Sequence, residues 1–119
     1  MIVTARTVPH WRQRYPTVGD WQTPVPGHVT ITVSAMSDWR YEALVMLHEA
    51  VEAAICQHRG ISEAAVDEWD KAWDGDGEPG DDPAAPYHEA HMIATQLERQ
   101  FADALGVALE TYEKEIDSL

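Results

Sequence analysis

The longest apolar run in the chain covers residues 43–56 (ALVMLHEAVEAAIC), and only three ionisable residues interrupt it. The run contains no Gly or Pro and is too long for an ordinary strand, so it predicts a helix that is buried on most sides. Ser37 or Asp38 can cap the start of this helix, and Gly60 is a typical residue at a helix end. We therefore expect the helix to run from about Asp38 to Arg59.

The first third of the chain alternates in the way that is typical of strands. Ile2–Val8 is rich in β-branched residues, and Val29–Val33 places three apolar side chains on one face and two threonines on the other. Prolines and glycines break the intervening segment into turns, with at most one short edge strand near residues 17–22. These segments predict a small antiparallel sheet that needs a helix packed on it to be stable.

Three further helices are predicted after Gly60. Ser62 is placed to begin a short helix, Pro86 suits the first turn of a longer amphipathic helix, and a short final helix follows Gly106. The Asp- and Gly-rich segment 74–86 is expected to be a loop.

Together these patterns predict an α+β fold in one domain, a size that suits 119 residues. Residues 1–36 are expected to form a small N-terminal antiparallel hairpin or sheet. Residues 37–119 are expected to form three or four helices packed on that sheet.

The net charge of −13 is distributed unevenly along the chain. Residues 1–41 carry four arginines against two aspartates, whereas residues 42–119 carry four basic and nineteen acidic side chains. This acidic surface repels phosphates, which argues against a nucleic-acid partner and leaves a peptide or protein partner open. Most of these charges are expected to be solvated and to keep the protein in solution.

No apolar run approaches the length of about 18 residues that a membrane-spanning helix needs, and the first residues do not resemble a secretory signal. Cys56 is the only cysteine and cannot form an internal disulfide, which fits a reducing compartment. We therefore expect a cytoplasmic protein without a membrane partner, in which Cys56 is a small buried apolar residue. The oligomeric state is not indicated by these patterns.

The three ionisable residues in the apolar run suggest a metal site. His48 and Glu52 are four residues apart and share one helical face, and Glu49 lies one position away from His48. Burying unpaired charges is costly, but an imidazole and a carboxylate on one face can together hold a divalent ion. Glu49 is then placed to act as a general base beside that ion.

A second histidine cluster, Tyr87-His88-Glu89-Ala90-His91, begins the later amphipathic helix. His91 lies at the edge of the apolar face, so it reaches the same point as His48 and Glu52 if the two helices pack together. Two imidazoles and one carboxylate with an open position are the arrangement of catalytic zinc sites. We therefore predict zinc, or another divalent metal, held by His48, Glu52 and His91, with His88 as the reserve ligand.

The sequence His48-Glu49-Ala50-Val51-Glu52 resembles the HExxH helix of the zincin metallopeptidases, with Glu52 in place of the second histidine. This resemblance implies that His48 and Glu52 are ligands, Glu49 is the catalytic base, and His91 or His88 is the third ligand. It also implies hydrolysis of a peptide or amide bond. The whole chain is similar to small phage- or prophage-encoded proteins of unassigned function that have an HExxE helix and a later PGDxPxxPYH segment.

Other interpretations of the same residues stay open. His48 and Glu52 can form a simple ion pair on a helix edge, which would stabilise the helix by only a few tenths of a kcal/mol. The pairs Glu49 with Glu52 and Asp67 with Asp70 resemble the ExxE and ExxD magnesium ligands of all-α nucleotide pyrophosphohydrolases, although histidines are unusual magnesium ligands.

A non-enzymatic alternative is a small acidic interaction module with a structural metal or none. Five tryptophans are many for a core of this size, and exposed aromatic residues often contact partners. Trp11 and Trp21, in the Pro-rich segment, are the candidates for such a surface. Cys56 is a poor candidate nucleophile because His48 lies more than two helical turns away from it.

Overall fold

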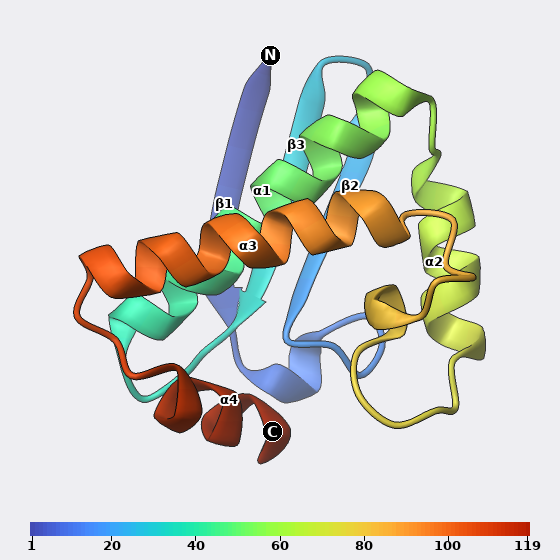
Figure 1. Cartoon of the computed structure of the whole chain (residues 1–119). Helices are drawn as coiled ribbons and strands as arrows, with labels where there is room; N and C mark the ends of the chain where they lie inside the picture. The colour runs from blue at the N-terminus through green and yellow to red at the C-terminus, as the bar shows by residue number, and fades with distance from the viewer.

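The computed structural model describes all 119 residues as a sheet of three strands followed by four α-helices (Figure 1). The elements are β1 (Ile2–Val8), the 3-10 helix η1 (His10–Arg12), β2 (Gly19–Val25), β3 (His28–Ser34), α1 (Trp39–Arg59), α2 (Glu63–Ala72), the 3-10 helix η2 (Pro79–Asp81), α3 (His88–Ala104) and α4 (Leu109–Asp117). This is the expected α+β fold class.

The sheet has the strand order β1-β3-β2, with β3 in the centre. Strands β2 and β3 form an antiparallel hairpin, and Gly27 supplies the positive φ angle of 79° in its turn. The expectation of a wholly antiparallel sheet is wrong, because β1 runs parallel to β3, from Ile2 beside His28 to Val8 beside Ser34. Residues 9–18 carry the chain across the end of the sheet, a width of about 10 Å, and leave a place for β3 between the first two strands.

Helix α1 has the boundaries that its sequence predicts. The side chain of Asp38 accepts a hydrogen bond from the Arg40 backbone N–H at 2.9 Å, which caps the first turn. At the other end, Gly60 adopts the left-handed conformation with φ 70° and terminates the helix. The cap at Ser62, whose hydroxyl accepts from the Ala65 backbone N–H, likewise begins α2 as expected.

Three layers position the functional residues, because α1 packs on β2 and β3 on one side and on α3 on the other (Figure 1). The sheet contributes Val29, Ile31 and Val33 to the core, and α1 contributes the fully buried Leu44. At the α1–α3 contact the buried residues are small. Ala53 and Cys56 on α1, and Ala90, Ala94 and Ala102 on α3, have almost no exposed surface. These small side chains allow the two helices to approach closely, so polar groups on their facing sides meet.

The tryptophans divide between core and surface. Trp21 is 4% exposed, so its assignment to a partner surface is wrong, whereas Trp11 is 78% exposed and Trp39 is 69% exposed. Cys56 is fully buried, as expected for a small apolar residue. None of the helices combines the length and the apolar character that a membrane crossing requires.

Candidate metal centre

Two helices bring three metal-binding side chains together. His48 and Glu52 lie one turn apart on the side of α1 that faces α3, and His91 projects from the first turn of α3. All three side chains are buried, with exposed fractions of 7%, 5% and 5%. The structure therefore joins three of the sequence-predicted residues into one group that can hold a metal ion.

The three ligand atoms form a nearly equilateral triangle. His48 Nε2 lies 3.2 Å from Glu52 Oε2 and 3.1 Å from His91 Nδ1, and His91 Nδ1 lies 3.1 Å from the same Glu52 oxygen. A tetrahedral ion with bonds of about 2.0–2.1 Å spaces its ligand atoms about 3.3–3.4 Å apart. The triangle is therefore within a few tenths of an ångström of the size that such an ion requires.

Carboxylates outside the triangle fix the orientation of both imidazole rings. His48 Nδ1 donates to Glu98 Oε1 at 2.7 Å, and Glu98 in turn accepts from the Tyr112 hydroxyl at 2.5 Å. His91 Nε2 lies 2.9 Å from Asp81 Oδ1 and 3.0 Å from Glu78 Oε2. An ionised carboxylate only accepts, so the outer nitrogens carry protons, and the inner nitrogens face Glu52, where each can carry a proton or offer its lone pair to a metal ion.

Glu52 is also fixed from outside the triangle. Its second oxygen, Oε1, accepts a hydrogen bond from the indole N–H of Trp21 at 3.0 Å. Trp21 comes from β2, so the sheet contributes to a centre whose ligands all lie on helices. The contact leaves Oε2 as the ligand atom and restricts rotation of the carboxylate.

The electrostatics of the triangle favour positive charge at its centre. Burial by itself would lower the pKa of His48, but hydrogen bonds to Glu52 and Glu98 raise this pKa well above its ordinary value. Burial also opposes the charged form of His91, yet Glu52 and Glu78 raise its pKa to about 10. For Glu52, burial is outweighed by the two histidines, which lower the pKa of its carboxyl group. Protons or a metal cation can supply the charge that these carboxylates stabilise.

Glu49 lies beside the triangle and faces the same cavity as the three ligands. No protein group within hydrogen-bonding distance stabilises its charge, and burial together with the neighbouring Glu52 raises its pKa well above the usual range. A cation in the triangle would oppose this shift. The Glu49 side chain also packs against Gly19, where an added Cβ would lie 2.9 Å from Glu49 Cγ.

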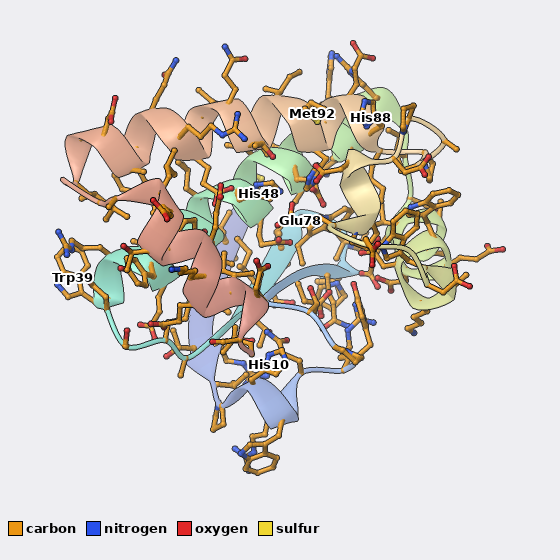
Figure 2. The ribbon with its side chains drawn as sticks, turned by 60° about the horizontal axis from the view of Figure 1, so that its bottom comes forward. His10, Trp39, His48, Glu78, His88 and Met92 are labelled. Carbon is orange, nitrogen blue, oxygen red and sulfur yellow. The ribbon has the colours of Figure 1, made fainter.

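The cavity has a volume of about 370 Å³. Its walls include the start of β2, the face of α1 with the ligand residues, η2 and parts of α2, α3 and α4. Figure 2 shows His48 between the helices, and Glu78, an exposed residue just before η2, lines the same cavity at its solvent side. A space of this size beside three ligands can accommodate water and a small organic group.

His88, the reserve ligand, does not join the three residues. Its Nδ1 donates to the carbonyl oxygen of Gly80 at 2.9 Å, and the residue lies with Met92 on the outer side of α3 (Figure 2). Gly80 also contacts His91 closely, because an ideal Cβ at this position would lie 2.4 Å from His91 Cγ. His88 therefore anchors the η2 segment, which holds His91 in place.

The magnesium alternative is not assembled in the structure. Asp67 accepts hydrogen bonds from Arg14 at 3.1 Å, and Asp70 accepts from the hydroxyls of Tyr15 and Tyr87. Neither aspartate belongs to a group of ligand atoms that can hold a metal with Glu52. Cys56 is fully buried, and burial raises its thiol pKa to about 12, which disfavours a nucleophilic thiolate.

Sequence reasoning missed the residues that orient the ligands. Glu98 lies seven positions after His91, two turns along the same face of α3, so helical spacing was a usable signal for it. Trp21, Glu78 and Asp81 give no comparable signal, because they reach the centre from β2 and from the segment around η2. A second group, formed by Glu78, Asp81 and the outer nitrogen of His91, can also hold a cation, but both of its acids are exposed.

Comparisons of the chain with protein-family models, with curated proteins and with solved structures found no match. The resemblance to zincins is therefore confined to the residues of α1 that carry it. Any assignment of function rests on the geometry and chemistry of the candidate centre.

Proposed function

We propose that this protein binds one divalent metal ion, with zinc preferred, through His48, Glu52 and His91. The triangle of ligand atoms, with both outer imidazole nitrogens held by carboxylates, is the observation that supports this proposal. Two imidazole nitrogens and one carboxylate oxygen form a donor set that suits zinc, whereas magnesium and calcium prefer oxygen ligands.

Elemental analysis of the purified, tag-free chain tests this proposal. The parent is expected to contain about one zinc per chain, and His48→Ala is expected to lose it. His58→Ala is the matched control, because His58 is exposed at the end of α1 and lies outside the cavity. An absence of metal in the parent, without thermal stabilisation by added zinc, manganese or magnesium, would contradict the proposal.

The reaction that this centre supports best is metal-assisted hydrolysis of an amide or peptide bond. The ion would supply Lewis acidity, which polarises a carbonyl group and lowers the pKa of water. Glu49 would accept the proton that water loses as its oxygen bonds to the carbonyl carbon. It would then deliver that proton to the leaving nitrogen as the carbon–nitrogen bond breaks. Water and an amide thereby give a carboxylic acid and an amine.

Glu49→Gln tests the role of Glu49 as a base. Gln keeps the size of the side chain but does not accept the proton, so we expect hydrolysis of aminoacyl-coumarin amides by the zinc-loaded chain to fall by about 100-fold or more. Zinc content and thermal stability should be retained. Glu68→Gln on the exposed side of α2 is the control and should leave the rate unchanged. Full activity in Glu49→Gln would refute the assignment of the base.

The alternative of an interaction module with a structural metal is supported by the exposed indoles of Trp11 and Trp39. A structural zinc site normally closes with four protein ligands. Three ligand atoms lie in the triangle, and the candidate fourth ligand, His88, instead donates to Gly80. This arrangement favours a site with an open position over a closed one.

A further inference from the structure

The walls of the cavity beside the triangle are strongly acidic. Eight acidic side chains line the cavity, and no lysine or arginine does. Two of these acids, Glu49 and Asp70, are only partly exposed although neither belongs to the triangle and neither forms an ion pair with a basic side chain. A solvated acidic surface that only maintains solubility does not require such burial, so the charge distribution in the cavity calls for another explanation.

Neutralisation by the protein itself accounts for only part of this charge. Arg14, from outside the cavity lining, makes ion pairs with Asp20 at 2.7 Å and with Asp67 at 3.1 Å. One guanidinium and one divalent ion stand against eight carboxyl groups, so an excess of acidic groups remains in the cavity. Partly enclosed walls of one sign concentrate their field in the cavity and attract ligands of the opposite sign.

Aromatic rings are a second feature that points to a cation. Tyr15, Trp21, Tyr87 and Tyr112 all line the cavity, and π-faces attract ammonium and guanidinium groups. The Tyr15 ring already attracts two cations of the protein itself, with Arg14 5.5 Å and Lys71 5.8 Å from its centroid. The hydroxyls of Tyr15 and Tyr87 both donate to Asp70, so this carboxylate is held between two tyrosines. A carboxylate that two hydroxyls hold in place keeps further lone pairs, with which it can accept a charge-assisted hydrogen bond from an organic cation.

We propose that the substrate of the candidate centre carries a positively charged amine or guanidinium group, and that Asp70 with Tyr15 and Tyr87 contributes to its recognition. The inference rests on the proposed hydrolytic function and adds the substrate class to it. Amides or peptides with a basic side chain belong to this class. Substrates with phosphate or carboxylate groups are disfavoured, because the cavity offers them no lysine or arginine.

Three hydroxamates of equal chain length test the charge preference directly. ε-Aminocaproic hydroxamate, caproic hydroxamate and adipic monohydroxamate share a metal-binding head and end in an ammonium, a methyl and a carboxylate group. Binding to the zinc-loaded full chain is measured by calorimetry near pH 8, at about 20 mM and about 500 mM salt. We expect the ammonium compound to bind about tenfold or more tightly than the carboxylate compound at low salt, with a smaller ratio at high salt.

Two variants separate a charge effect from a structural one. Asp70→Asn keeps an acceptor for the tyrosine hydroxyls, so it should weaken binding of the ammonium compound several-fold and leave caproic hydroxamate unchanged. Glu113→Gln, on an exposed position of α4 outside the cavity, should alter neither. Equal binding of all three compounds, or tighter binding of the carboxylate, overturns the cation preference alone. If zinc is bound but none of the three compounds binds, the result refutes the proposal of an open coordination position at the zinc. It then also refutes the proposed cation preference.

Discussion

Gly80 provides a sharp test of the candidate centre because its missing side chain leaves room for a metal ligand. The residue is buried in η2, and an ideal Cβ at this position would lie 2.4 Å from His91 Cγ and 2.6 Å from His91 Nδ1. Contacts between non-bonded carbon atoms are most favourable at about 3.5–4.0 Å. In Gly80→Ala, the His91 ring or the η2 backbone must therefore move by about 1 Å.

A movement of this size is large for a metal site. Ligand distances hold to within about 0.2 Å of their usual values, so a displaced His91 Nδ1 no longer completes the triangle with His48 and Glu52. If η2 moves instead, His91 loses the carboxylates of Glu78 and Asp81 that orient its ring. Either response should lower zinc affinity by about 10- to 100-fold, and overpacking should cost about 1–3 kcal/mol of folding stability.

Competition with a coloured zinc chelator measures the affinity, and urea denaturation of the metal-free chains measures stability. Gly106→Ala is the control, because Gly106 has φ 67° and no atom near its missing Cβ. This variant should lose about 1–2 kcal/mol through left-handed strain and bind zinc like the parent. Parental zinc affinity in Gly80→Ala would refute the placement of His91 in the centre.

Two further predictions concern side chains around the cavity. Trp21→Phe removes the indole donor to Glu52 and should lower zinc affinity by about tenfold in the same competition assay, whereas Trp73→Phe, which loses only a contact to a loop carbonyl, should not. For Asp70, burial raises the pKa of its carboxyl group from 3.8 to about 6. The protonated form thus stabilises the fold below about pH 4, and this stabilisation is lost as the pH rises through about 6. Asp70→Asn should therefore gain on the order of 1–2 kcal/mol relative to the parent between about pH 4.5 and pH 7.5, after allowance for solvent screening. Urea denaturation with a chelator present measures this difference, and a difference that does not change with pH would contradict the buried, charge-disfavouring environment.

Local signals explain the parts of the fold that the sequence predicted well. Asp38 and Gly60 define α1 to within one residue, because capping depends on side-chain and backbone chemistry within a single turn. The parallel pairing of β1 was not predicted. It depends on contacts between residues about 26 positions apart, such as Ile2 with His28, for which the strand pattern carries no directional information.

The residues of the candidate centre also fall into two groups, those that local sequence spacing indicates and those that only tertiary contacts reveal. His48 and Glu52 were identified from their spacing on one helix, and His91 from its place on the edge of an apolar face. Trp21 and Glu78 were not identified, because their contacts with the ligands depend on how the strand and the η2 segment pack against α1 and α3. Spacing along the chain indicates which side chains share a face, but only tertiary packing shows which groups orient them.

The position of β1 has a consequence for how the molecule opens and refolds. Its side chains are exposed except for the half-buried Val8, and it is hydrogen-bonded to the sheet along one edge only. A segment with so few buried contacts detaches at a much lower free energy than the core, so its amide protons should exchange with solvent well before those of β3. None of the residues of the candidate centre lies in β1. Release of this strand therefore exposes one edge of β3 while the hairpin, α1 and α3 keep the centre assembled.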